Sequence, residues 1–433
     1  MSQNELPPGS CRIGYAWDAD HPDLYPAMLR NHQGRLELTI PFPTDDVSLR
    51  RRYIGDQASW GDDPDLTRYN YDLPNQIWFY DTNGCASLVG LRRARGTYGG
   101  PTNLAQTTLE IAFAVFTGDA GVDYSKVNGL QAQIEGLDQW IGVRTVTNSL
   151  EELWAGEGKD ITINIAAPTS LPVDRGLNLT LISGADWKLP AGPGATSITD
   201  KGLTQTNVSK ARSWEEHLSR HRAVHQLLEI SSWRPLGFRN IQTMHAQDPD
   251  RLLSGDAIGD RWAAVTTFRL PPVEAPGGTY WFLFAYKDVG ARGVRRWLRL
   301  REQFSTALDA MTFSIRRQTS LQGRISDAGI GLEAIGHIIR AQRGDTGRVG
   351  HHAQLAAIAA EIADLLPFNA DEWASRSTQV YNDVKHADRP EAEPNEMLSS
   401  LKQNRMVFRL WVARRLGVSD DVLRAGKWLL DRQ

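Results

Sequence analysis

The segment 372–387 places the residue types of acid–base chemistry at helical spacing. At about 100° per residue, its apolar side chains fall on one side of a predicted helix, and they are Trp373, Val380, Tyr381 and Val384. The polar side chains fall on the opposite side, and they are Arg376, Gln379, Asn382, Asp383 and His386. Side chains one turn apart, such as those of Asn382 and His386, can reach each other. Burial of the apolar side therefore leaves a face with an imidazole, an amide, a carboxylate and a cation.

Such a face has the chemistry that RNA cleavage without a metal ion would use. Attack by the 2′-hydroxyl needs a proton acceptor, a proton donor and positive charge beside the phosphate. An imidazole titrates near neutral pH and can act as base or acid, and an amide can hold a phosphate oxygen. The alternative is a solvated helix face with one surface histidine, and spacing alone does not decide between the two.

A second set of polar residues has the spacing of metal ligands. His217, His221 and His225 recur one turn apart with Glu229 next in line, and two histidines at this spacing can share a zinc ion. No cysteine or other cluster of ligands stands nearby in the sequence. A partly buried polar stripe is therefore the favoured interpretation, and the sequence predicts neither a metal nor another cofactor.

Arginines open the predicted helical region and could follow an RNA backbone; they are Arg292, Arg295, Arg296 and Arg299. Trp297 and Leu298 between them fit an ordinary amphipathic helix equally well. Further arginines occur at 90–101 among several glycines. That stretch lacks the strand–loop–helix context of a phosphate-binding loop, so a mobile basic hairpin is predicted there.

Length and composition are those of a globular protein with two or three domains. The 433 residues are 41% hydrophobic and 23% charged, a typical balance. No apolar run approaches a membrane span, and the N-terminus lacks a signal-peptide pattern. Only two cysteines occur, Cys11 and Cys85, which favours free thiols in a reducing compartment. We therefore expect a cytoplasmic protein that does not enter a membrane.

Charge is unevenly spread along the chain. Residues 288–433 hold 22 Lys and Arg against 18 Asp and Glu, whereas the remainder holds 26 against 33. A mildly basic C-terminal region after an acidic N-terminal one is weak support for an anionic partner such as RNA.

Alternation of polar and apolar residues predicts a β-rich region up to about residue 200. The predicted strands are 34–40, 76–80, 86–90, 109–116, 161–165 and 177–181, with a hairpin turn at 81–84. One helix is predicted at 213–230, where Ser213 and Glu216 can form a capping box. Two more strands are predicted at 262–270 and 279–286. Such a series is typical of a sandwich or curved sheet.

From about residue 289 the hydrophobic period changes to that of helices. The predicted helices are 293–316, 321–343, 354–365, 372–387 and 396–416. Ser320 can cap the second helix, and Gly344 and Gly417 stand where helices end. The sequence thus predicts an α+β, multidomain chain. A β-rich, sandwich-like region over 1–287 precedes an all-helical bundle over 288–433.

Several stretches resemble the ApeA-like anti-phage proteins, which join a β-rich N-terminal domain to a C-terminal HEPN domain. The N-terminal likeness rests on Gly14-Tyr15-Ala16-Trp17 with 36–38, on 78–91 and on 221–235. The C-terminal likeness rests on 330–336 and on Tyr381-Asn382-Asp383-Val384-Lys385-His386. The resemblance covers most of the chain.

This resemblance implies a ribonuclease that serves abortive infection. The family motif is an Arg, often followed by a polar residue, and then a His a few positions on. Asn382 and His386 match its second and last positions, while Tyr381 stands in place of the Arg. HEPN domains are typically two-fold dimers with the motif at the interface, so Arg376 or Lys385 of the partner subunit could approach His386. The candidate site residues are His386, Asn382, Arg376, Lys385 and Asp383.

The same resemblance implies the partners: RNA, with tRNA as one candidate, a second copy of the chain bound through the helical domain, and a phage-derived trigger. The N-terminal region would then sense the trigger and regulate the nuclease. Tyr381 favours an alternative, a degenerate HEPN sensor or adaptor that binds RNA or a protein without cutting.

A third hypothesis, a carbohydrate-binding β domain, rests on tryptophans in the β-rich region. They are Trp17, Trp60, Trp78, Trp140, Trp154 and Trp187. Exposed aromatic rings on a sheet can bind sugars, but burial in a core is the commoner explanation.

Overall fold

A computed structural model describes residues 4–19, 22–32, 34–46, 73–97, 104–118, 120–148, 163–188, 196–273, 278–316, 319–386, 388–390 and 392–431. The chain divides into two compact units. The first consists of Met1–Ala132, Gln205–Leu218 and Phe238–Pro272; the second consists of Gln133–Thr204, Ser219–Gly237 and Val273–Gln433. A boundary between the units falls inside each of β7 (Lys126–Ile134), β12 (Ser197–Ser213) and α3 (Trp214–Ser232). The linear division at residue 287 stays a prediction.

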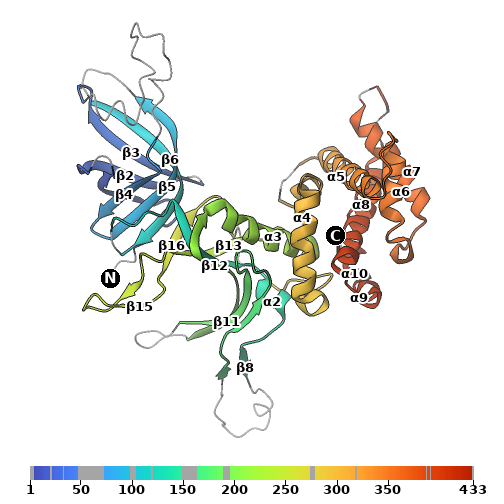
Figure 1. The fold of residues 1–433 in the computed structure, drawn as a ribbon. Coiled ribbons are helices and arrows are strands. Elements are labelled where there is room, and N and C mark those ends of the chain that lie inside the picture. The colour runs from blue at the N-terminus through green and yellow to red at the C-terminus, as the bar shows by residue number, and fades with distance from the viewer. Residues whose placement is uncertain are drawn as a thin grey trace. The chain divides into compact units, whose positions relative to one another are not determined.

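Six antiparallel strands of the first unit close into a barrel (Figure 1). They are β1 (Cys11–Trp17), β2 (Tyr25–His32), β3 (Arg35–Pro43), β4 (Gln76–Asp81), β5 (Gly84–Thr97) and β6 (Leu104–Thr117). The order β6-β3-β2-β1-β4-β5 returns to its start because β5 also pairs with β6. Residues such as Leu38, Phe79 and Leu109 form its core. The β-rich fold class is confirmed, and the barrel is the form that the sheet takes.

A buried ion pair ties β1 to the β4–β5 turn inside this barrel. Arg12 donates through Nε and Nη2 to the two carboxylate oxygens of Asp81, at 2.8 and 2.6 Å. Its guanidinium also lies 5.7 Å from the ring centroids of Phe79 and Phe116. Bidentate geometry and flanking rings offset part of the cost of burying both charges. Asp81 also accepts from the Asn83 backbone N–H at 2.8 Å, as the predicted hairpin turn requires.

The remaining strands extend the sheet or form short ribbons. In the first unit β16 (Trp262–Thr267) pairs with β6, and β13 (Phe238–Met244) pairs with β16. In the second unit β10 (Thr169–Pro172) pairs with β11 (Thr180–Lys188). Two small ribbons are β8–β9 (Val146–Asn148, Ile163–Ile165) and β14–β15 (Asp250–Arg251, Ala257–Gly259).

Two predicted strands are corrected by the structure. The segment 279–285 forms no strand. The Leu283 N–H donates to the Ser231 carbonyl, and the Phe284 carbonyl accepts from the Trp140 indole, so these backbone groups bond outside any sheet. The strand predicted at 177–181 begins only at Thr180, since Asn178 adopts a positive φ of 50° that interrupts extended backbone. Residues 161 and 162 of another predicted strand lie outside the described residues.

The expected basic hairpin at 90–101 is a strand as far as Thr97, where β5 ends; residues 98–101 lie outside the described part. Among the tryptophans, Trp140 is buried, Trp187 is exposed, and Trp17 stacks on Trp78. Trp60 and Trp154 also lie outside the described residues. The tryptophans that the structure describes therefore do not form one shared aromatic surface, as the carbohydrate hypothesis would require.

The helical elements of the second unit follow the predicted order. After α2 (Leu137–Ile141) and α3 come α4 (Tyr286–Arg316), α5 (Leu321–Gln342), α6 (His351–Ala359), the 3₁₀ turn η4 (Ala363–Leu365), α7 (Ala370–Lys385), α8 (Pro394–Leu416), α9 (Asp420–Ala425) and α10 (Lys427–Asp431). Ser320 caps α5 by accepting from the Gly323 N–H, and Gly417 ends α8 with a φ of 89°. At α3, Ser213 and Glu216 form the predicted capping box. No helix among the described residues is long and apolar enough to span a membrane.

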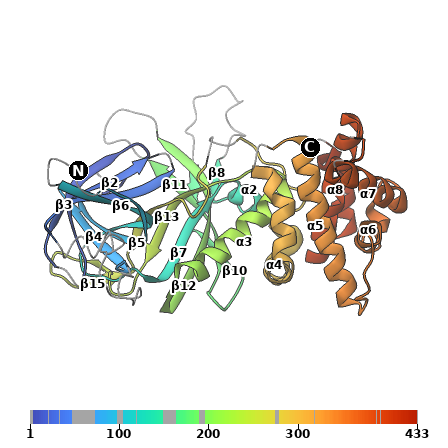
Figure 2. The same ribbon diagram turned by 90° about the horizontal axis from the view of Figure 1, so that it is seen from above.

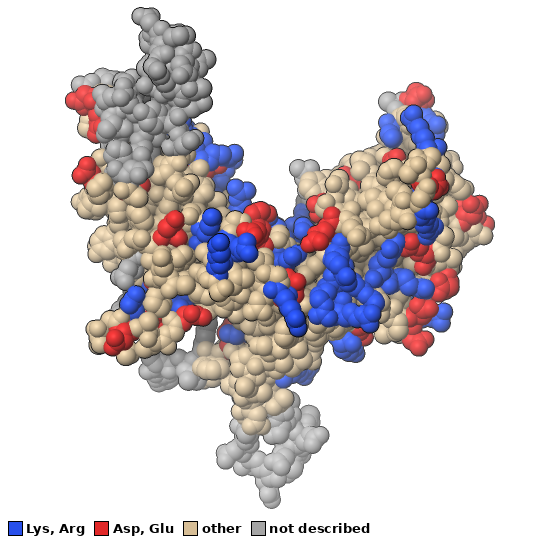
Figure 3. All heavy atoms as spheres, viewed as in Figure 1, with Lys and Arg blue, Asp and Glu red and all other residues tan. Residues whose placement is uncertain are grey.

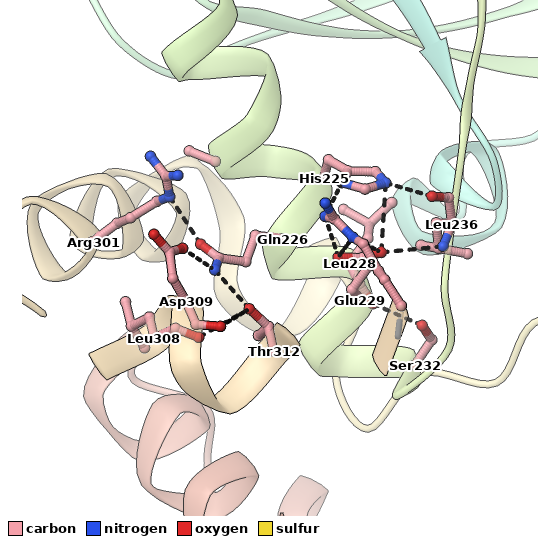
Figure 4. Close-up of polar contacts among 12 residues, drawn as sticks. His225, Gln226, Leu228, Glu229, Ser232, Leu236, Arg301, Leu308, Asp309 and Thr312 are labelled. Atoms are coloured by element: carbon pink, nitrogen blue, oxygen red, sulfur yellow. Dashed lines mark hydrogen bonds and ion pairs between the residues drawn. The ribbon is translucent and has the colours of Figure 1, made fainter. Parts of the chain in front are cut away.

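A polar network joins the second part of α3 to α4 (Figure 4). Glu229 is fully buried and accepts from the Arg316 guanidinium, while its Oε1 also accepts from the Leu236 N–H at 3.2 Å. Gln226 donates to Asp309 and Thr312 at 2.9 and 3.0 Å. Figure 4 shows Gln226 of α3 facing Asp309 and Thr312 of α4, and Glu229 lying close to Leu236. Each buried polar side chain named here therefore has a partner, as burial requires.

The helical region also depends on α3 through buried donors. Arg409 of α8 is almost fully buried and donates to the carbonyls of Ile230 and Ser231 at 3.0 and 2.6 Å. Trp297 of α4 donates from its indole N–H to the Ala223 carbonyl at 2.6 Å. Helices α4 and α8 thus use α3 backbone oxygens as acceptors.

We predict that the fragment 288–433 is far less stable than a fragment 133–433, which retains every part of the second unit. Without α3 the buried guanidinium of Arg409 loses two acceptors, and hydrogen bonds to a charged group contribute about 1.5–3 kcal/mol each. Urea denaturation followed by circular dichroism measures the difference. Equal midpoints for the two fragments would contradict the structural role assigned to α3.

Candidate functional site

Helix α5 is central to the helical region, and glycines let three neighbouring helices approach it. Figures 1 and 2 both show α5 between α4 on one side and α6 and α7 on the other. A Cβ at Gly331 would lie 2.6 Å from Met311 Cγ of α4, and one at Gly336 would lie 2.6 Å from the Gln354 carbonyl carbon of α6. A Cβ at Gly329 would lie 2.5 Å from Tyr381 Cε2 of α7. Each glycine therefore makes room for a different partner.

Helix α7 begins and packs as its sequence predicts. The Asn369 side chain caps it by accepting from the N–H groups of Asp371 and Glu372. Trp373, Val380 and Tyr381 are buried, and Asn404 of α8 accepts from the Trp373 indole and the Ser377 hydroxyl at 2.9 and 2.8 Å. The predicted apolar side is confirmed, with half-buried Val384 at its edge.

The end of α7 differs from the prediction. The helix stops at Lys385, and His386 is the C-cap residue with extended φ and ψ of −110° and 109°; Ala387 lies outside the described residues. The His386 backbone N–H still donates to the Asn382 carbonyl at 3.0 Å. His386 and Lys385 are both exposed at the end of the helix, and Asn382 and Asp383 are half-buried beside them. The imidazole is therefore attached where the chain leaves the helix, beside the last polar turn.

Positive charge near this helix end comes from two residues of the same chain. Arg389 follows His386 in a tight turn, since its N–H donates to the His386 carbonyl at 3.1 Å. Its guanidinium lies 3.8 Å from the Asp383 carboxylate. The Lys385 ammonium lies 5.2 Å from the ring centroid of Tyr381, within the range of a cation–π contact. Arg376 is exposed more than two turns earlier on α7.

Tyr381, which replaces the motif Arg, belongs to the packed interior. Its ring is 5% exposed, fills the space left by Gly329, and stacks on His351 with centroids 4.7 Å apart. The His351 ring has Thr378 Oγ1 at 3.1 Å from Nδ1 and the Gly329 carbonyl at 3.4 Å from Nε2. Burial lowers the pKa of His351, against the opposing effects of that carbonyl and Glu333. The imidazole is therefore held in its neutral form against α7.

Sequence reasoning missed two residues near the helix end. Arg389 stands three positions past His386, and only the fold of the turn brings it to Asp383. His351 is far away in the sequence and begins α6, so no local spacing could link it to Tyr381. A cation directly after a predicted helix end is the one signal that sequence offered for Arg389.

The arginines at the start of α4 have mixed roles. Arg295 donates to the Val173 carbonyl at 3.0 Å and Arg296 to the Leu416 carbonyl at 3.2 Å. Arg292 and Arg299 are both exposed. Figure 3 shows Lys and Arg gathered on the helical region over the area of α4, α9 and α10. Their role in binding RNA stays a prediction.

The histidine series on α3 is a buried stripe of hydrogen-bonded rings, as favoured from the sequence. His217 contacts Thr206 Oγ1 and the Val127 carbonyl at 2.8 and 3.1 Å. His221 contacts Thr204 Oγ1 at 2.6 Å. His225 has the Leu236 carbonyl at 2.7 Å from Nε2 and Arg316 Nη2 at 2.8 Å from Nδ1. The ring nitrogens in these contacts are engaged by protein groups.

Two family models match the chain. The model described as ApeA N-terminal domain 1 matches residues 12–297, and the one described as Apea-like HEPN matches residues 339–422. The first covers more than half of the chain, and the second contains α7 with the candidate residues. The chain therefore belongs to the ApeA-like proteins with a C-terminal HEPN domain. No match was found among curated proteins or among solved structures.

We predict that Gly329→Ala destabilises the protein by about 1–3 kcal/mol, the usual range for overpacking a filled core. The added methyl group would overlap the Tyr381 ring. Gly323→Ala in the first turn of α5 is the matched control, because its Cβ would meet only the Thr319 and Ser320 side chains at 3.3 Å or more. Thermal unfolding compares them, and equal effects would contradict the close packing.

Stability should also fall as the solution becomes acidic. Because the folded-state pKa of His351 is lowered from 6.5, its contribution is present above that pH and is lost as pH falls below it. Urea denaturation at pH 7.5 and 5.5 measures the loss. His351→Phe retains a ring against Tyr381 but cannot take up a proton, so its loss should be smaller. An unchanged pH dependence in this variant would show that His351 does not contribute.

Proposed function

We propose that this protein is a metal-independent HEPN-type ribonuclease that acts in anti-phage abortive infection under control of its N-terminal region. Membership of the ApeA-like family supports this proposal. The single observation that carries it is the exposed imidazole of His386 at the end of α7, beside Asn382, Asp383 and Arg389. This cluster offers a base or acid, an amide and a cation within a short stretch of chain.

The proposed reaction is attack of an RNA 2′-oxygen on the adjacent phosphorus, which breaks the bond to the 5′-oxygen. His386 would accept the 2′-hydroxyl proton or return a proton to the leaving 5′-oxygen. Asn382 would hold a non-bridging phosphate oxygen, and Lys385 and Arg389 would offset its charge. Asp383 would orient Arg389 through the ion pair between them.

A second copy of the chain would complete the site. One imidazole cannot act as base and acid in the same step, and two-fold symmetry would bring a second His386 toward the first. The exposed Arg376 of α7 would then serve as a phosphate contact supplied across the dimer. Arg292 and Arg299 of α4, which are both exposed, would follow the RNA backbone further from the cleaved bond.

We predict that His386→Ala lowers RNA cleavage by at least about 100-fold, the minimum usual contribution of a general acid or base. The side chain is exposed, so unfolding free energy should change by no more than about 0.5 kcal/mol. Cleavage of total RNA and of tRNA by the purified full chain, with circular dichroism, measures both effects. EDTA should leave cleavage unchanged.

Variants at other positions separate this site from a general surface effect. His337→Ala removes another exposed histidine of the helical region and should retain full cleavage. Asn382→Ala should reduce cleavage less than His386→Ala, since an amide positions the phosphate and transfers no proton. If His386→Ala folds normally and cuts RNA at the wild-type rate, the nuclease assignment is wrong.

The chain should be a dimer in solution at micromolar concentration. Sedimentation velocity should give a species of twice the 48.3 kDa chain mass. A strict monomer, with and without RNA, would rule out a site composed of two subunits.

One observation favours an alternative function. Tyr381 is packed between Gly329 and His351, so the position of the motif Arg carries no charge. A HEPN domain of this kind could bind RNA or a protein partner without cleaving. Filter binding and an RNA cleavage assay on wild type and His386→Ala distinguish the two functions. An adaptor that binds RNA would retain it on the filter in both forms, and neither form would cleave it.

A further inference from the structure

A cavity of about 280 Å³ lies in the first unit, at one side of the barrel. Its walls come from the β2–β3 turn, from β5 and β6, and from the residues that follow β16. Apolar walls are provided by Leu36, Ile111 and Phe268, and polar walls by Arg35, Arg92, Arg269 and Glu110. The polar part of this lining is slightly the larger, so a charged ligand suits it better than an apolar one.

Two glycines keep the cavity open. Gly34 and Gly90 line it with positive φ of 76° and 71°, a conformation that other residues rarely adopt. At Gly90 a Cβ would lie 2.6 Å from the Ala112 Cβ, so a side chain there would be strained and crowded. The backbone therefore favours residues without side chains at two points of the wall.

The strand register of β5 and β6 places charged side chains next to each other at the cavity wall. Arg92 of β5 lies directly opposite Glu110 of β6, and it donates to the Glu110 carboxylate through Nε at 3.1 Å and also through Nη2. Arg35 reaches the same carboxylate through Nη1 at 3.4 Å. These bonds to arginine lower the pKa of Glu110. The Glu110 carboxylate thus holds the guanidinium groups of Arg35 and Arg92 beside it at the wall of the cavity.

The cations outnumber the carboxylate. Arg35, Arg92 and Arg269 line the cavity with Glu110 as its acidic residue. Arg35 and Arg92 are 67% and 77% exposed at their side chains, whereas Glu110 is 20% exposed. Solvent and a ligand can therefore reach the guanidinium groups, while the carboxylate lies behind them. A guanidinium carries five N–H donors, so the donors that do not bond to Glu110 remain for phosphate oxygens.

Phe268 adds a flat apolar surface to the same cavity. Its side chain is 38% exposed, so the ring can be reached from the cavity that it lines. Aromatic rings stack on nucleobases of any sequence. The cavity thus combines a surface for a ring with positive charge for an anion, and its volume is close to the lower limit of small-molecule sites.

We propose that this cavity binds a nucleoside monophosphate, with the base on Phe268 and the phosphate on Arg35 and Arg92. The cavity lies in the first unit and shares no residue with the cluster at the end of α7. The proposal therefore does not depend on ribonuclease activity. It gives the N-terminal region a small-molecule ligand of defined chemistry.

Isothermal titration of the full chain tests the proposal with AMP, adenosine, inorganic phosphate and a six-residue oligoribonucleotide. AMP should bind saturably with a Kd below roughly 1 mM. Adenosine lacks the phosphate and inorganic phosphate lacks the ring, so each should bind at least about tenfold more weakly. Failure of AMP to bind, or binding of the oligonucleotide alone, overturns the proposal.

Variants locate the site. Arg92→Gln and Phe268→Ala should each weaken AMP binding by about tenfold, because they remove a charge-assisted hydrogen bond and a stacking surface. Arg95→Gln is the matched control: it is an arginine of the same strand that pairs with Glu37 at 3.4 Å and does not line the cavity, so AMP affinity should be unchanged. Circular dichroism verifies folding. Equal AMP affinity in Arg92→Gln, Phe268→Ala and wild type places the ligand elsewhere and overturns the assignment.

Discussion

The helical region depends on how closely α4, α6 and α7 can approach α5. Gly331, Gly336 and Gly329 face these three helices in turn, and a methyl group at any of them would overlap a neighbour. Glycine lowers helix stability by about 1 kcal/mol relative to alanine, and the packing at the three contacts offsets that cost. The position of α7, and with it the position of His386, follows from the contact between Gly329 and the Tyr381 ring.

That contact also explains how the chain accommodates tyrosine where the family motif has arginine. A buried guanidinium would need a counter-charge, whereas the Tyr381 ring stacks on the neutral imidazole of His351. Positive charge is displaced outward to Lys385, above the ring, and to Arg389, beside Asp383. The interior of the motif helix is thereby apolar and aromatic, and its cations belong to the solvated end.

Local sequence patterns were sufficient for the elements that local interactions define. The capping box of Ser213 and Glu216, the Ser320 cap and the buried side of α7 all depend on neighbours within a few residues. Long-range contacts decided the rest. Barrel closure depends on β5 pairing with β6. The predicted strand at 279–286 is absent because backbone groups of Leu283 and Phe284 bond to Ser231 and to the Trp140 indole. For the same reason His351 was not predictable as a neighbour of Tyr381. Asn382, Asp383 and His386, by contrast, are close in the sequence, so their proximity at the end of α7 could be expected from helical spacing.

The second unit is assembled from three separate stretches of chain, one of which is the latter part of α3. Arg409 uses the carbonyls of Ile230 and Ser231, and Glu229 receives the guanidinium of Arg316. A gene fusion that joined a foreign N-terminal domain at the first residue of the helical sequence would lose these contacts of α3. A fusion that keeps them must therefore carry α3 together with the helices. The smallest segment that could be transferred to another protein with these contacts intact is therefore longer than the HEPN sequence match at residues 339–422.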